Sequence, residues 1–159
     1  MLNIKKENVN IDLNKGFTLI EILVVIGIIA VLSAVVLVAI NPARQFKLAR
    51  DSQRVSNVTA ILNAVGQNMA EHKGIFECTV ALPITAKNIS SASSTSNIDI
   101  GVCLVPTYIS SLPFDPNKTG AKYVSTSDYD TQYSISQDAD GRVKISAIGE
   151  ITNDISMTR

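Results

Sequence analysis

The chain has 159 residues, and its 14 Lys and Arg balance its 14 Asp and Glu, so the formal net charge is zero. This balance excludes a general electrostatic attraction to nucleic acid, and the length leaves room for one apolar span and one small domain. The sequence has one His and no Walker loop, dinucleotide fingerprint or zinc-ligand spacing. An enzyme is therefore the class of protein that the sequence supports least.

Residues 1–16 form a short polar segment that is weakly basic, with three Lys against one Glu and one Asp. Such a segment ahead of a long apolar run is typical of a targeting sequence rather than of a folded domain. We interpret it as a removable leader and exclude it from the predicted fold.

Residues 17–41 are predicted to form a transmembrane helix, because the run from Phe17 to Ile40 is apolar on every side apart from Glu21. Such a helix is roughly 36 Å long and can cross a hydrocarbon core of about 30 Å. A secretory signal fits less well, because the run is too long and no clear A-x-A site follows. A carboxylate at the centre of a span costs about 2.5–3.5 kcal/mol, so Glu21 suggests a use, although it lies near enough to the end to reach the interface.

The residues around this charge are the most specific signal in the chain. The run GFTLIE (residues 16–21), between a short basic leader and an unbroken apolar helix, resembles the site at which prepilin peptidase cuts its substrates. Those substrates are the type IV pilins and the pseudopilins of type II secretion. The resemblance is sharp over residues 15–40 and only architectural beyond about residue 75.

The resemblance implies cleavage between Gly16 and Phe17 and N-methylation of Phe17 as the new N-terminus. It also implies that Glu21 neutralises the N-terminal ammonium of a neighbouring subunit, which could set the axial register because unpaired charges out of water are costly. The implied partners are further copies of the chain, prepilin peptidase, an inner-membrane platform with its assembly ATPase, and the membrane. DNA or a surface ligand is a further candidate.

The implied function is that of a structural subunit of a pilus or pseudopilus-like filament, for adhesion, motility, DNA uptake or protein secretion. The subunit would first span the cytoplasmic membrane once, with its head outside the cytoplasm, and then join an extracellular or periplasmic filament. The positive-inside rule favours the opposite orientation, because the flank after the span is at least as basic as the leader. The alternative function is a membrane-anchored binding module that never polymerises.

Residues 42–74 are predicted to form an amphipathic helix under the head, with a kink or a helix boundary at Pro42. Its apolar positions recur at a spacing of seven with two more between them, and this stripe needs a partner surface. They are Leu48, Val55, Val58, Leu62, Val65 and Met69. Another face carries Arg44, Lys47, Arg50 and Arg54, which we expect to be solvated or to lie between subunits, although lipid headgroups or DNA could also bind there.

Residues 75–107 are predicted to form a loop, because they show no strong period and include a Ser-rich stretch. Cys78 and Cys103 bracket this stretch. Outside the cytoplasm we expect them to form a disulfide, whereas in a cytosolic domain they would be free thiols.

Residues 108–148 are predicted to form an antiparallel sheet, with strands near 121–126, 131–137 and 142–148 that alternate apolar and polar residues. The preceding LPFDP run (residues 112–116) resembles the connector ahead of the sheet in major pseudopilins. The predicted fold is α+β, a long N-terminal helix packed against a small antiparallel sheet as in pilins, and residues 149–159 are expected to be a flexible tail.

Several Asp residues cluster in the sheet region, and some major pseudopilins bind calcium in this part of the chain. The calcium candidates are Asp128, Asp138 and Asp140, since carboxylate oxygens suit that ion. The run DADG is also typical of a hairpin turn. Our expectation is therefore that the chain holds no cofactor, with calcium as the alternative.

Overall fold

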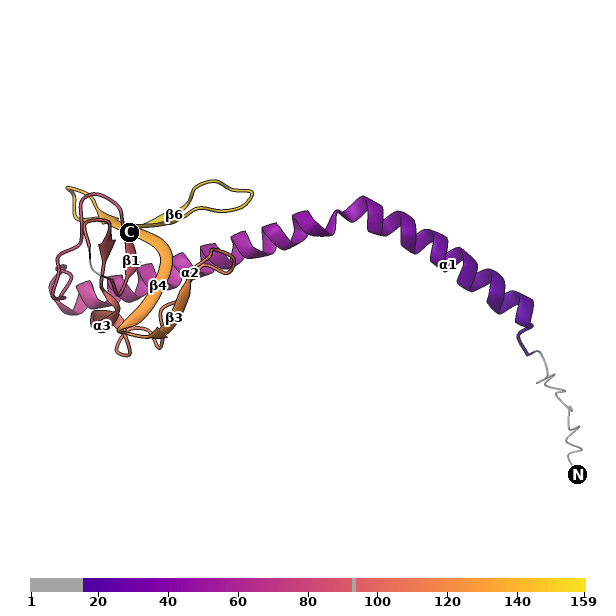
Figure 1. The fold of residues 1–159 in the computed structure, drawn as a ribbon, viewed down its shortest axis with the longest axis horizontal. Coiled ribbons are helices and arrows are strands. Elements are labelled where there is room, and N and C mark those ends of the chain that lie inside the picture. Colours follow the sequence, from indigo (N-terminus) through magenta and orange to yellow (C-terminus); the bar gives the residue numbers. More distant parts are fainter. Residues whose placement is uncertain (1–15, 93) are drawn as a thin grey trace, which may run out of the picture. The chain divides into compact units, whose positions relative to one another are not determined.

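The computed structural model describes residues 16–92 and 94–159, so the predicted leader lies outside the described residues except for Gly16. Two compact units meet at Pro42: an N-terminal helix and a head of helix and sheet that begins at Ala43 (Figure 1). The described elements are α1 (Leu19–Ile40), α2 (Pro42–Glu71), β1 (Lys87–Ser90), β2 (Asn97–Ile98), α3 (Gly101–Leu104), β3 (Lys122–Ser125), β4 (Asp128–Gln137), β5 (Val143–Ala147) and β6 (Ile155–Thr158).

Helix α1 is apolar on all sides, and none of its residues is buried within the chain. Its 22 residues are long and apolar enough to cross a membrane by length and composition. The helix ends at Ile40, and Asn41 follows with a left-handed φ of 47°. Pro42 then opens α2, a position where its missing N–H costs no helical hydrogen bond. The sequence predicts a kink or a helix boundary at Pro42, and the chain shows the boundary.

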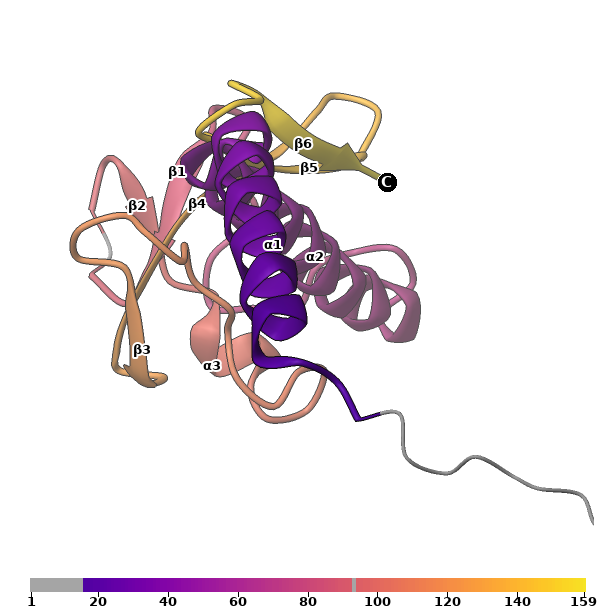
Figure 2. The same ribbon diagram turned by 90° about the vertical axis from the view of Figure 1, so that its right-hand side faces the viewer.

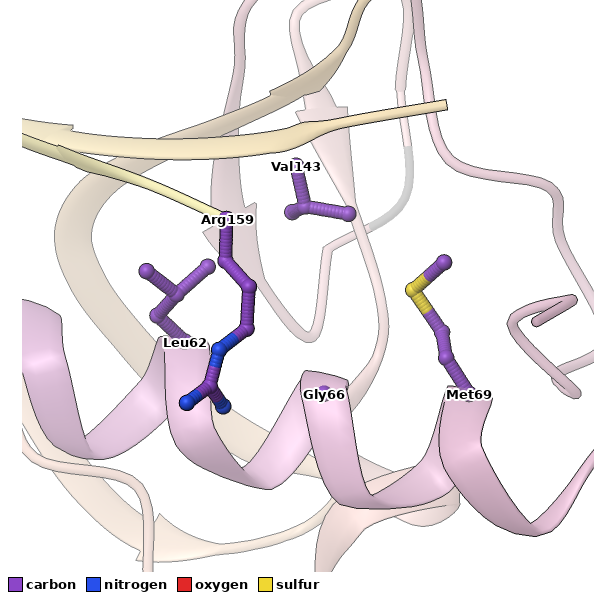
Figure 3. A pocket seen from close by; sticks show the side chains of 5 residues that line it. All are labelled: Leu62, Gly66, Met69, Val143 and Arg159. Atoms are coloured by element: carbon purple, nitrogen blue, oxygen red, sulfur yellow. The ribbon is translucent and has the colours of Figure 1, made fainter. Parts of the chain in front are cut away.

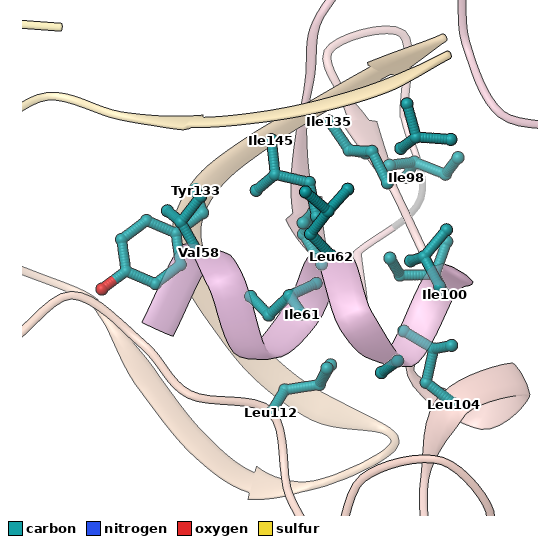
Figure 4. Packing of buried hydrophobic residues seen from close by; sticks show 14 of the residues in the cluster. Val58, Ile61, Leu62, Ile98, Ile100, Leu104, Leu112, Tyr133, Ile135 and Ile145 are labelled. Carbon is teal, nitrogen blue, oxygen red and sulfur yellow. The ribbon is translucent and has the colours of Figure 1, made fainter. Parts of the chain in front are cut away.

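The head has one core, formed where α2 packs against the sheet (Figure 4). Strand β4 alternates buried and partly exposed residues, so that its buried face looks toward the helix. The fully buried apolar side chains include Val58, Ile61 and Val65 from α2 and Tyr133, Ile135 and Ile145 from the strands.

The sheet has the strand order β2-β1-β4-β5-β6, and β3 pairs with the N-terminal end of β4. Among the described strands, β1 and β2 pair in parallel and the other pairs are antiparallel, so the whole sheet is mixed. The strands within the predicted antiparallel sheet, β3, β4 and β5, do pair antiparallel. In the turned view, β3 and the β5–β6 pair lie at opposite sides of the head (Figure 2). The three predicted strands correspond to β3, β4 and β5, and the α+β class is confirmed.

Two segments that were predicted to lack regular structure contain strands. The expected loop over residues 75–107 holds β1, β2 and the short helix α3, and a disulfide joins Cys78 to Cys103 across it, as the sequence predicts. The expected flexible tail over residues 149–159 contains β6, which pairs with β5 and buries Ile155. Both predictions failed because these strands are only two to four residues long, too short for a clear alternation of apolar and polar residues.

The buried face of α2 also differs from the predicted stripe. Val55 is 38 % exposed and Leu48 is half-buried, whereas Ile61 and Ala64 are buried. A strict spacing of seven drifts by about 20° per repeat on a straight helix, so the stripe turns by about 60° between Leu48 and Met69, and Ile61 and Ala64 belong to the buried face where Val55 does not.

Candidate functional site

The predicted cleavage bond, between Gly16 and Phe17, lies in an exposed segment that precedes the first helical residue. Phe17 is 80 % exposed, and a Cβ atom added to Gly16 would meet no heavy atom within 4 Å. A peptidase binds its substrate as an extended backbone, which a bond inside a helix cannot offer. The location therefore suits cleavage, and the cleavage itself stays a prediction.

Thr18 and Glu21 form a reciprocal cap at the start of α1. The backbone N–H of Glu21 donates to Thr18 Oγ1 at 3.3 Å, and the backbone N–H of Thr18 donates to Glu21 Oε2 at 3.4 Å. Thr18 was not among the predicted site residues, although Thr-x-x-Glu ahead of an apolar run is the signature of a capping box. The cap places the Glu21 carboxylate at the N-terminal end of its own helix, where the helix dipole favours negative charge.

A second group of charges lies inside the head, around Arg54 of α2. Its guanidinium donates two hydrogen bonds to Asp115, from Nε at 2.8 Å and from Nη2 at 2.9 Å. Nη1 donates to Asp51 at 2.8 Å and to Glu150 at 3.2 Å. Arg54, Asp51 and Asp115 are all buried. The prediction of a solvated or inter-subunit face was therefore wrong for Arg54.

Asp51 ties the loop between β5 and β6 to α2. It accepts hydrogen bonds from the backbone N–H groups of Glu150, Ile151 and Thr152 at 2.8, 2.9 and 3.1 Å. The approach is so close that a Cβ atom at Gly149 would lie 2.8 Å from Asp51 Oδ1, so a residue larger than glycine would displace the loop.

Asp115 ties the LPFDP connector to the same cluster. Besides its two bonds from Arg54, it accepts from the backbone N–H groups of Asn117 at 2.9 Å and Lys118 at 2.8 Å. At the edge of the cluster, Arg50 donates two bonds of 2.6 Å to the Glu150 carboxylate. Among the described residues, no buried side-chain nitrogen or oxygen lacks a partner.

The cluster holds its carboxylates ionised. Burial raises the pKa of Asp51, but the loop N–H groups and Arg54 outweigh it and bring the pKa well below its usual range. Burial also raises the pKa of Asp115, and bonds from Arg54 and the connector N–H groups outweigh it, so that this pKa is lowered too. The bond from Arg50 lowers the pKa of Glu150.

The calcium candidates do not form one group. Asp128 pairs with Lys122, whereas Asp138 and Asp140 both pair with Arg142 at 2.8 and 3.3 Å. Asp138 also accepts the backbone N–H groups of Asp140 and Arg142, which closes the hairpin between β4 and β5. In the part of the chain that the structure describes, no three His, Cys, Asp or Glu gather as a metal site would require.

A groove of about 220 Å³ runs between α2 and the C-terminal strands. Figure 3 shows the side chain of Arg159 reaching down to α2 between Leu62 and Gly66, with Met69 and Val143 at the other end of the groove. Arg159 Nη1 donates to Asn63 Oδ1 at 3.4 Å. We assign no ligand to this groove.

The described residues form an apolar N-terminal helix and an α+β head. Residues 12–37 match the family described as Prokaryotic N-terminal methylation motif. The match covers the Gly16–Phe17 bond and most of α1 and does not reach the head. No curated protein and no solved structure was found to match the chain.

This motif, together with the apolar helix that it largely covers, is consistent with a type IV pilin-like family, and the predicted resemblance is confirmed to that extent. The motif family is structural rather than enzymatic, and its helix is consistent with membrane anchoring before assembly. The individual roles of Gly16, Phe17 and Glu21 stay predictions.

Replacing Arg54 tests whether its cluster holds the head together. Arg54→Met keeps most of the side-chain volume but leaves Asp51 and Asp115 buried without their cation, so the free energy of unfolding should fall by about 3–5 kcal/mol. Arg142→Met is the matched control, because Arg142 is exposed and its loss should cost little. Urea denaturation of the full chain in detergent measures both values, and equal losses would contradict a central role for Arg54.

The same cluster predicts how stability depends on pH. The folded pKa values of Asp51, Asp115 and Glu150 lie below their unfolded values, so the unfolded chain binds more protons in acid. The stabilising contribution is complete above the unfolded pKa of about 4 and is lost as pH falls below it. Urea denaturation between pH 8 and pH 2 should show a plateau and then a decline, and a constant stability down to pH 2 would refute this origin.

Proposed function

We propose that this chain is a prepilin, the structural subunit of a type IV pilus or pseudopilus-like filament. The observation that carries the proposal is the match of residues 12–37 to the methylation motif, continued by a helix that buries none of its residues within the chain. An apolar helix of this length requires lipid, or other helices, around it. A filament built on packed α1 helices would supply the second environment after the membrane has supplied the first.

In this proposal, prepilin peptidase cuts after Gly16 and Phe17 becomes a methylated N-terminus. The exposed segment before Thr18 supports such a reaction, because the enzyme can bind the bond without unwinding α1. The new ammonium group then lies within one helical turn of Glu21 along its own chain.

Glu21 serves assembly by pairing with the N-terminal ammonium of a neighbouring subunit. Between packed apolar helices the effective dielectric constant is low, so an unpaired charge is destabilising and the attraction between two opposite charges is strong. A subunit shifted along the fibre axis would leave both charges unpaired. The pair therefore favours one register among the many that apolar contacts alone would allow.

The head lies outside the cytoplasm in this proposal, first at the membrane and then on an extracellular or periplasmic filament. The disulfide between Cys78 and Cys103 supports this location, because disulfides persist in oxidising compartments. The partners would be further copies of the chain, prepilin peptidase and an inner-membrane platform with its assembly ATPase. The filament would act in adhesion, motility, DNA uptake or secretion, and the role of the subunit is structural rather than enzymatic.

The cap on α1 allows the charge of Glu21 to be tested apart from its helix-starting role. Glu21→Gln keeps a side chain that can complete the capping box but removes the charge, whereas Thr18→Ala removes the cap and keeps the charge. We expect Glu21→Gln to be processed and to reach the membrane normally. Filament should nevertheless fall by about ten-fold or more, the effect of losing roughly 1.4 kcal/mol at each subunit contact.

The measurement is the amount of filament sheared from cells, with the membrane-bound amount of each variant as reference. Thr18→Ala should assemble far better than Glu21→Gln. If Glu21→Gln formed as much filament as the unaltered chain, the pairing role would be contradicted. Processed chains that form no filament in any variant, including the unaltered one, would favour the anchored binding module instead.

A further inference from the structure

A recess opens on the outer face of the sheet, away from the core, where two strands leave a gap along one edge of β4. Strand β1 pairs with one edge of β4, and β3 and β5 share the other edge, at residues 128–130 and 134–137. The connector fills the gap between them, since the backbone N–H of Asp115 donates to the carbonyl of Thr131 at 3.0 Å. The recess has a volume of about 100 Å³, and its lining includes Lys118, Gln132, Ser134, Ser146, Asn153 and Asp154.

The recess brings together two opposite charges that have no partner. Lys118 is half-buried and Asp154 is exposed, and within residues 16–92 and 94–159 neither side chain has an ion-pair or hydrogen-bond partner. Between them, Ser134 and Ser146 lie directly opposite each other on β4 and β5, and in the same part of the chain their hydroxyls have no partner either. The three calcium candidates, by contrast, all pair with neighbouring cations.

Both charged walls of the recess are held in place by the Arg54 cluster. The backbone N–H of Lys118 donates to the Asp115 carboxylate at 2.8 Å, and that carboxylate is bound by Arg54. Asn153 and Asp154 directly follow the three loop residues whose N–H groups bind Asp51. The two charges are therefore carried by segments with a fixed position, which lowers the cost of ordering a binding site.

Gln132 adds a strained residue at the same place. Its φ is 60°, a left-handed value that is uncommon for a residue other than glycine and that the surrounding structure must stabilise. Its backbone N–H and its Nε2 both donate to Asp130, at 3.0 and 2.9 Å. The side-chain oxygen of Gln132 is therefore left as an acceptor at the recess.

We propose that this recess binds a small zwitterion, an α-amino acid with a short side chain. Lys118 and the hydroxyls of Ser134 and Ser146 would donate to its carboxylate, and Asp154 and the Gln132 oxygen would accept from its ammonium. The volume lies well below the roughly 300–1,000 Å³ of pockets for drug-sized ligands, which restricts the ligand to a few heavy atoms. This inference goes beyond the proposed function and does not depend on it.

Titration of the unassembled full chain, labelled with ¹⁵N and held in detergent micelles, tests the proposal. L-Alanine should shift the backbone amide resonances of Gln132, Ser134 and Ser146 until they saturate. Propionate and ethylamine each keep one of the two charges of L-alanine. Each should bind at least about ten-fold more weakly, the equivalent of roughly 1.4 kcal/mol for the lost charge contact.

Two pairs of variants provide the matched comparison. Lys118→Gln and Asp154→Asn should each weaken the binding of L-alanine by about ten-fold or more. Lys144→Gln and Asp140→Asn make the same changes at exposed positions outside the recess and should leave the binding unchanged. The dispersion of the amide resonances reports whether each variant is folded.

Amide resonances that do not move with L-alanine, or propionate that binds as tightly as L-alanine, would overturn the inference. Equal losses in the two pairs of variants would do the same. Saturation by D-glucose and not by L-alanine would overturn it in favour of a neutral sugar. None of these results depends on cleavage or assembly, so a failure here leaves the proposed function standing, and the filament and N-terminal measurements test that function separately.

Discussion

The buried guanidinium of Arg54 is the interaction on which the arrangement of the head depends. It joins α2 to the LPFDP connector through Asp115 and to the β5–β6 loop through Asp51 and Glu150. Neither of these segments lies in a sheet ladder at its point of attachment. Apolar burial is not directional, and it positions the sheet over α2 without determining where these two loops lie. Bidentate and charge-assisted hydrogen bonds are directional, and they provide that position.

The opposite situation holds in α1, because none of its apolar side chains is buried against the rest of the chain. Its apolar surface is satisfied only by an environment outside the chain, and its one carboxylate bonds to the first turn of the same helix. A head with a complete core and a helix with none are suited to separate tasks. In the proposed function, the helix exchanges lipid for neighbouring helices without any change in the core of the head.

The parts of the fold that the sequence predicted have local signals. The length of the apolar run predicts α1, and the alternation in β4 and β5 predicts a sheet with one buried face. The parts that were missed either depend on distant partners or are strands too short for a clear pattern. Nothing near Arg54 in the sequence shows that Asp115, 61 residues away, will pair with it. Strand β1 is rich in polar residues and is defined by its pairing with β4, and β6 had a weak signal in the alternation of Ile155 and Met157.

The functional residues differ in the same way between those with a local signal and those without one. The run GFTLIE predicts the residues for cleavage and assembly, because a protease recognises consecutive residues. The cap between Thr18 and Glu21 has a local signal of the same kind, Thr-x-x-Glu ahead of an apolar run. The burial of Arg54 could not be seen in the sequence, since it depends on carboxylates that the fold brings to it.

The mass of the N-terminal peptide of the native protein tests the central claim most directly. It should be measured on the membrane fraction and on material sheared from the cell surface. A chain that begins at Phe17, with or without an added methyl group, is the expected result and means that prepilin peptidase uses this bond. A native chain that still contains Gly16, in a host with active prepilin peptidase, would contradict the assignment as a prepilin.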